Sequence, residues 1–276
     1  MIRLLRQRSK DDFELKSFTA HTAPPYAILS HTWTDGAEVT YDDLVASTGK
    51  DKAGYDKIRF CGQRAAEEGL EYFWVDTCCI DKSSSAELSE SINSMYRWYQ
   101  QADVCYAYIE DWPSELTWAD PLRWFTRGWT LQELIAPKKM EFFDGNQKSR
   151  GMKFDPLVVE ELSRITGISA SVLSDRSGDS LRGICYGQRM SWAAYRKTTR
   201  IEDIAYCLLG IFHIHMPLLY GEGVKAFTRL QEVILASSTD LSLLAWTQSP
   251  EDTQTYRGIL SRHPHEFRSQ FRTRSL

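Results

Sequence analysis

Four short runs of apolar residues alternate with amphipathic or polar stretches in the first part of the chain. The runs begin at residues 26, 72, 104 and 139, and polar residues or turn-forming pairs such as Asp144-Gly145 follow them. Continuous apolar runs of this length are typical of strands buried on both faces. Repeated alternation of strand and helix predicts an α/β fold, with a mainly parallel sheet flanked by helices.

The stretches between these runs carry helix signals. From Tyr55 the apolar positions recur at helical spacing until Gly69, which we expect to end that helix. Ser84 and Glu87 have the spacing of a capping box, and the helix that they would open has an apolar face extending to residue 102.

The second half of the chain predicts helices rather than further strands. One helix is expected over residues 156–165, a second after the capping-box pair Thr199 and Glu202 and ending at Gly210, and a third from residue 224. We therefore divide the chain into an N-terminal arm (1–25), an α/β core (26–150), a C-terminal helical subdomain (151–248) and a polar tail or the start of a further region (249–276).

Composition excludes several classes of protein. The 33 basic and 37 acidic residues give a net charge of -4 without a sustained basic run, which argues against nucleic-acid binding. No apolar run approaches the length of a membrane span, and the first residues lack the apolar core of a signal peptide, so we expect an intracellular, cytoplasmic protein. The six cysteines lie in strand-like and helix-like contexts, as reduced thiols do.

Polar residues gather where the predicted strands end. They lie at 30–33, at 76–81 and on the predicted helix after Gly128, which carries Trp129 and Glu133 on one face. Ligands of parallel sheets bind beyond the carboxyl ends of the strands, so we expect these groups to converge there.

Five blocks of the sequence resemble a known family. YAILSHTW at 26–33, WVDTCCIDK at 74–82 and RGWTLQEL at 127–134 are similar to the signature blocks of the fungal heterokaryon incompatibility (HET) domain, and TTRIEDIAYCLLG at 198–210 and MPLLYGEG at 216–223 resemble what commonly follows it. The resemblance implies an effector of regulated cell death in fungal nonself recognition. It further implies a distant relation to Toll/interleukin-1 receptor (TIR) domains, with a TIR-like or flavodoxin-like sheet, and self-association with an upstream sensor as partner.

The TIR resemblance implies cleavage of the nicotinamide–ribose bond of NAD or a related nucleotide, with Glu133 as the catalytic carboxylate. A carboxylate beside the ribose can stabilise an oxocarbenium-like transition state. NAD is then the substrate, and neither a cofactor nor a metal is expected. The residues assigned to substrate binding are Ser30, His31, Trp33, Asp76, Cys78, Asp81, Arg127 and Trp129.

Several alternatives remain open. Asp76 and Asp81 could bind Mg²⁺ or simply cap the next helix. Ser30 with His31 and Asp76, or Cys78 as nucleophile, would suit a hydrolase, although no nucleophile-elbow pattern surrounds Ser30.

Cys78 and Cys79 are neighbours on the predicted strand and would face opposite sides of the sheet, unlike a metal-binding pair. His213, His215 and the segment 221–223 are interpreted as structural. The alternative to an enzyme is a signalling module that acts by self-association and partner recruitment.

Overall fold

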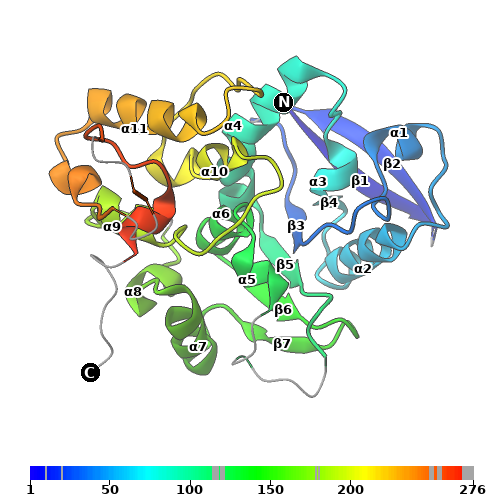
Figure 1. Ribbon diagram of the computed structural model, residues 1–276. Helices are drawn as coiled ribbons and strands as arrows, with labels where there is room; N and C mark the ends of the chain where they lie inside the picture. Colours follow the sequence, from blue (N-terminus) through cyan, green and yellow to red (C-terminus); the bar gives the residue numbers. More distant parts are fainter. Residues whose placement is uncertain are drawn as a thin grey trace.

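The computed structural model describes residues 1–9, 11–19, 21–113, 118, 122–177, 179, 181–248, 252–253 and 257–268. Its centre is one seven-stranded sheet. In Figure 1 the sheet lies to the right of the helical part, by which we mean the helices from residue 156 onward. The strands are β1 (Ile2–Ser9), β2 (Asp12–Phe18), β3 (Tyr26–His31), β4 (Tyr72–Trp74), β5 (Val104–Tyr108), β6 (Met140–Phe143) and β7 (Ser149–Met152).

The strand order is β2-β1-β4-β3-β5-β6-β7. The four central strands are parallel, whereas the β1–β2 hairpin joins antiparallel on one side and β7 joins antiparallel on the other. The α/β prediction is confirmed, and the four predicted strands form the parallel core. Across the sheet, the parallel strands follow one another as the second, first, third and fourth of the four along the chain (β4-β3-β5-β6). This is the flavodoxin-like order, and its switch point lies between β3 and β5.

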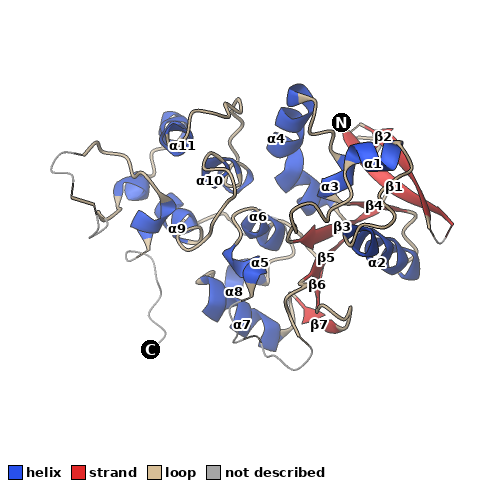
Figure 2. Ribbon diagram, turned by 45° about the vertical axis from the view of Figure 1, so that its right-hand side comes forward, coloured by secondary structure: helices blue, strands red, loops and turns tan. Residues whose placement is uncertain are grey.

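Helices cover both faces of the sheet. Helix α2 (Gly54–Glu67) packs against β3 and β4 on one side, while α4 (Ser85–Gln101) and the short α6 (Thr130–Ile135) lie on the other side (Figure 2). Alternate strand residues therefore face different helices. On the α2 side, the ring of Tyr106 lies 6.3 Å from that of Phe60, and on the α4 side Trp74 packs against Trp98.

Two predicted helix boundaries are confirmed. Gly69 adopts a left-handed φ of 76° directly after the C-cap of α2, a conformation that glycine reaches without strain. Ser84 is the N-cap of α4, and its hydroxyl accepts a hydrogen bond from the Glu87 amide.

The second predicted strand is shorter than its apolar run. β4 ends at Trp74, and the helical turn α3 (Asp76–Cys79) follows, so the prediction that Cys78 and Cys79 are strand residues facing opposite sides is wrong. The run misleads because a buried helical turn is as apolar as a buried strand. Both thiols are buried, and all six cysteines are free.

The remaining described elements are helical, and the helices predicted at 156–165 and from residue 224 are among them. They are α1 (Tyr41–Val45), α5 (Arg123–Thr126), α7 (Pro156–Thr166), α8 (Ala170–Leu173), α9 (Tyr186–Ser191), α10 (Asp203–Tyr206), α11 (Lys225–Ser237) and three 3-10 turns, η1 (Gly210–Phe212), η2 (Leu241–Leu244) and η3 (Pro264–Phe267). None of these described helices combines the length and the apolar character needed to cross a membrane. In the C-terminal region, η3 packs against α9 and Phe267 is fully buried.

The predicted capping box at Thr199 and Glu202 is wrong. The helix begins only at Asp203, and its N-cap Glu202 makes no side-chain cap. The Glu202 carboxylate instead accepts hydrogen bonds from the backbone amides of Gly221 and Gly223, while the Thr199 hydroxyl accepts one from Arg127. The Glu202 side chain, which the local sequence pattern assigned to a helix cap, thus binds the distant loop at 221–223 instead.

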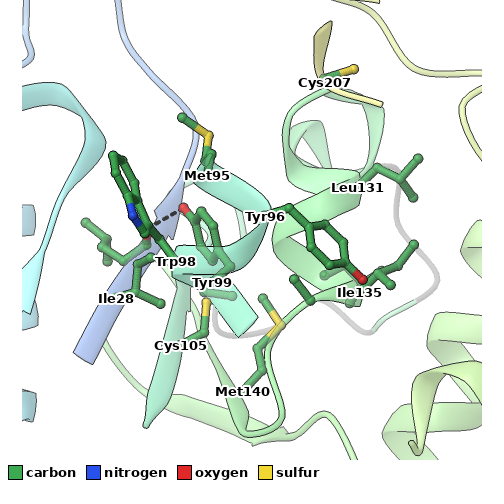
Figure 3. Packing of buried hydrophobic residues seen from close by; sticks show 14 of the residues in the cluster. Ile28, Met95, Tyr96, Trp98, Tyr99, Cys105, Leu131, Ile135, Met140 and Cys207 are labelled. Carbon is green, nitrogen blue, oxygen red and sulfur yellow. Dashed lines mark hydrogen bonds between the residues drawn. The ribbon is translucent and has the colours of Figure 1, made fainter. Parts of the chain in front are cut away.

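The sheet and the helical part share one core. Figure 3 shows Tyr96 of α4 beside Leu131 and Ile135 of α6, with Met140 below them. Gly210 lies so close to α4 that an added Cβ would stand 2.0 Å from the Tyr96 Cβ, so any side chain at this position would separate the two parts.

Candidate functional site

The candidate site is built around one buried hydrogen bond at the switch point of the sheet. Ser30 is near the carboxyl end of β3, and its hydroxyl donates to the Glu133 carboxylate over 2.5 Å. The same hydroxyl accepts a hydrogen bond from the indole nitrogen of Trp124 at 2.9 Å. The prediction that the end of β3 and the helix bearing Glu133 converge therefore describes the observed geometry.

Glu133 is held in a state that resists ionisation. Its residue is only 5% exposed. Burial, followed by the negative charge of Asp76, raises its pKa to about 8, although the hydrogen bond from Ser30 and the charge of Arg196 oppose the shift. At neutral pH the side chain is therefore mainly a neutral acid. A carboxyl group with a pKa near the working pH suits proton transfer, and once ionised it could stabilise a cation.

Two buried cations fix the helix that carries Glu133. The Arg196 guanidinium donates to the Arg127 carbonyl and the Thr130 hydroxyl where α6 begins, both at 2.8 Å. The Lys153 ammonium donates to the carbonyls of Leu134, Ile135 and Pro137 where α6 ends. Among the described residues, neither cation has a carboxylate within 4 Å. They act by satisfying backbone and hydroxyl oxygens at both ends of α6.

A second polar cluster adjoins the first. The Asp76 carboxylate lies 3.0 Å from His31 Nε2 and accepts a hydrogen bond from the indole nitrogen of Trp33 at 2.9 Å. Burial alone would raise the pKa of Asp76, but the hydrogen bond with His31 and the charges of His31 and Lys82 bring it below its usual value. Asp76 is thus an anion close enough to disfavour a second negative charge on Glu133.

The second ring nitrogen of His31, Nδ1, faces Glu38 on the side away from Asp76. His31 Nδ1 is buried, and the described residues offer it no hydrogen-bond partner; the nearest acid is Glu38, whose Oε2 lies 4.0 Å away. Glu38 itself pairs with the buried Lys57 at 2.6 Å. Trp33 is 41% exposed and stacks under the Lys82 ammonium, which makes this side of the site the solvent-facing one.

Arg127 and Trp129 contact the helical part instead. The Arg127 guanidinium donates to the Thr199 hydroxyl at 3.0 Å, and the Trp129 indole donates to Asp203 at 3.3 Å. Trp129 and Glu133 are four residues apart, yet they bond to different neighbours, Asp203 and Ser30. The structure therefore places these two predicted substrate-binding residues among contacts of their own, apart from the Ser30–Glu133 pair.

Cys78 and Asp81 take local roles. The Cys78 thiol is fully buried and lies 3.8 Å from the Val75 carbonyl, and burial raises its pKa well above the usual range. Asp81 accepts hydrogen bonds from the backbone and hydroxyl of Ser83, a turn that leads into α4. Within the part of the chain that the structure describes, no three His, Cys, Asp or Glu side chains form a metal-binding group.

Sequence reasoning missed Arg196, Lys153 and Glu38, which support the site from other segments. A lone cation in an apolar context was the available signal for Lys153, which follows Met152 directly. Close packing explains the glycine at position 128, because an added Cβ would stand 2.5 Å from Thr198 Cγ2 and 3.1 Å from Cys207 Sγ. Only glycine lets the start of α6 approach the helical part so closely.

Comparison with known proteins identifies the family. The family described as "Heterokaryon incompatibility protein (HET)" matches residues 26–117. The chain is also 47% identical over 232 residues to the vegetative incompatibility protein HET-E-1 of Podospora anserina. The chain carries a HET domain. The matched HET-E-1 segment covers 79% of this chain but only 17% of that protein, and no solved structure matches the chain.

Proposed function

We propose that this HET domain acts in heterokaryon incompatibility as an effector of cell death, and that it cleaves the nicotinamide–ribose bond of NAD or a related nucleotide. The incompatibility role is supported by the family match and by the name of the Podospora relative. The chemical step is supported above all by the buried carboxyl of Glu133 at the switch point of the sheet, with a pKa raised to about 8.

Glu133 would act on the developing charge of the ribose. As the glycosidic bond breaks, the ribose carbon becomes cationic, and an ionised carboxylate beside it lowers the barrier. The nicotinamide ring of NAD is itself a cation, and a positive charge placed near Glu133 favours the carboxylate form. Binding of NAD should therefore release a proton and become stronger as the pH rises from 6 to 8.

The neighbouring groups have distinct roles in this proposal. Ser30 orients the Glu133 carboxylate through its 2.5 Å hydrogen bond. Asp76, with His31 and Trp33, supplies the polar wall on the solvent-facing side, where the exposed ring of Trp33 can stack on a flat ring. Because Glu133 is covered in this conformation, the reaction requires a rearranged state, which self-association driven by an upstream sensor would supply.

The proposal is tested by incubating purified protein with NAD over a range of protein concentrations and measuring free nicotinamide. Glu133→Gln keeps the size of the neutral acid but cannot ionise, so release should fall by about 100-fold or more. Glu160→Gln, on the exposed side of α7, is the matched control and should release nicotinamide like the unaltered protein. No release at any concentration, or equal release from the Glu133 variant, would contradict the enzymatic proposal.

A second candidate function is a module that works by self-association and partner recruitment without catalysis. One observation favours it: Glu133 lines neither of two surface cavities of the molecule, while apolar side chains of Ile201, Leu219 and Val224 are more than half exposed around the 219–224 loop. Loss of cell death on expression of Ile201→Ser and Leu219→Ser variants, with Glu133→Gln still lethal, would favour this function over NAD cleavage.

A further inference from the structure

A second cavity lies apart from the Glu133 site, between the helical part and the C-terminal segment. It has a volume of about 890 Å³, within the range of ligand-binding pockets. One wall is the loop at 194–199 with the start of α10, and the other is formed by residues near η3. Glu133, Ser30 and Asp76 do not line it, so it is not part of the site described above.

One part of the cavity is lined by apolar side chains. Tyr195 and Ile201 line it and are 57% and 52% exposed, and Ile204 lies buried beneath them. The Tyr195 ring stands edge-on to His265, with 5.7 Å between the ring centres. Large apolar side chains exposed beside a cavity provide a surface on which a planar ring can stack.

The other part of the cavity is cationic. Lys197 and Arg262 line it together with the imidazoles of His263 and His265. Among the described residues, no carboxylate lies within 4 Å of the Lys197 ammonium, whose residue is exposed.

The two acids that line the cavity already have partners. The Glu266 carboxylate accepts hydrogen bonds from the Arg257 guanidinium, the Ser261 hydroxyl and the Arg262 amide. Asp252 lies 3.2 Å from Arg257 and 3.7 Å from Arg262. Lys197 is therefore left to pair with an incoming anion, while the Arg262 guanidinium, which also lines the cavity, contacts Asp252 at the longer distance of 3.7 Å.

The cavity wall is joined to the helix that carries Glu133. The Lys197 amide donates to the Thr126 carbonyl at 2.7 Å, and the Gly128 amide donates to the Lys197 carbonyl at 2.9 Å. The preceding residue, Arg196, also lines the cavity and donates to the first turn of α6. A ligand on Lys197 would thus contact the backbone segment that fixes the entry to α6.

We propose that this cavity binds a phosphate-bearing nucleotide, with its phosphate on Lys197 and Arg262 and its base on the apolar wall formed by Tyr195 and Ile201. The site is separate from the Glu133 centre and does not depend on the cleavage reaction. Its occupancy stabilises the paired segments 126–128 and 196–198, and with them the start of α6.

Calorimetric titration of the whole protein with AMP tests the proposal, because AMP has no nicotinamide–ribose bond and is not consumed by the reaction proposed for Glu133. AMP should bind with a dissociation constant at or below the millimolar range, and Lys197→Met and Arg262→Met should each weaken it by about 10-fold. Lys225→Met, at an exposed lysine away from the cavity, is the matched control and should bind AMP unchanged.

Adenosine and inorganic phosphate are the further arms of the experiment. Each should bind at least 10-fold more weakly than AMP, because each occupies only one part of the cavity. Phosphate binding as tight as AMP would overturn the assignment of a nucleotide. Undetectable AMP binding, or unchanged binding to both cavity variants when thermal melting shows that they are folded, would overturn the site itself.

Discussion

Two buried glutamates in this domain behave in opposite ways. Glu133, beside the carboxyl end of the central strand β3, and Glu202, at the start of α10, are 5% and 7% exposed. Burial and Asp76 raise the pKa of Glu133 to about 8. Hydrogen bonds from backbone amides, first its own and that of Gly221, lower the pKa of Glu202. The state of a buried carboxyl here depends on how many donors face it and on the charge beside it.

The difference in pKa matches a difference in role: Glu202 supports the structure, whereas Glu133 is the reactive group of the proposed site. Glu202 is bonded to Gly221 and Gly223, and the adjacent Asp203 accepts from the Tyr220 hydroxyl and the Trp129 indole. This region holds the 219–223 loop against α10 and the entry to α6. Glu133 is hydrogen-bonded to the Ser30 hydroxyl and has an anion nearby, so its protonation can change within the physiological range.

The pH dependence of stability should show the largest contrast. The raised pKa of Glu133 means that the folded protein keeps a proton that the unfolded chain has released, so this group's stabilising contribution decreases as the pH rises from about 4.5 to about 8. Glu133→Gln should remove this dependence, which amounts to roughly 4 kcal/mol between pH 5 and 8. Urea unfolding of both proteins across that range measures it.

The control for this measurement is Glu202→Gln. Because the pKa of Glu202 is lowered, its contribution is complete above about pH 4.5 and is lost only in more acidic solution. The difference between this variant and the unaltered protein should therefore stay constant from pH 5 to 8. Equal pH profiles for Glu133→Gln and the unaltered protein would show that Glu133 is not the titrating group.

The next largest effect on stability is expected at Lys153, which supports the helix of Glu133 but not the region of Glu202. Lys153→Met leaves three carbonyls at the end of α6 without a donor and should lower the free energy of unfolding by about 3 kcal/mol. Lys138→Met, at an exposed lysine nearby, should change it by less than about 0.5 kcal/mol. Similar losses from the two variants would show that these carbonyls do not depend on Lys153.

The parallel core was predictable because its strands are buried on both faces and therefore form continuous apolar runs. The hairpin of β1 and β2 was not, since β2 has no buried residue and the buried residues of β1 stand among charged ones, and the sequence predicted no more than an arm there. The end of β4 was misplaced because the turn α3 is as apolar as the strand before it.

The site was predictable only where polar residues follow strand ends. That rule brought Ser30, His31, Trp33, Asp76 and Glu133 together. It could not reveal that Arg127 and Trp129 contact Thr199 and Asp203, more than 70 residues away, because a single sequence carries no sign of that pairing. The capping-box prediction for Thr199 and Glu202 was wrong for the same reason, because the loop at 221–223 binds the Glu202 carboxylate.

A smaller effect is expected on the Glu202 side. Glu202→Ala leaves the Gly221 and Gly223 amides without their acceptor and should cost about 2 kcal/mol of unfolding free energy. Glu202→Gln retains one acceptor oxygen and should cost about half as much. Hydrogen exchange should locate the change at residues 219–223. Loss of protection at Ser30 and Glu133 instead would show that the two regions are not energetically separate.

The smallest effect should come from Ser30→Ala, which makes Glu133 less like Glu202. The variant removes the hydroxyl that donates to Glu133 and accepts from the Trp124 indole, and one such pair contributes about 1 kcal/mol. Because the hydrogen bond from Ser30 lowers the pKa of Glu133, its loss should move that pKa above about 8. Carboxyl-carbon NMR of a glutamate-labelled sample measures the titration directly. A midpoint that stays unchanged, or moves down, would mean that Ser30 does not favour the ionised form, and the contrast with Glu202 would then rest on burial and Asp76 alone.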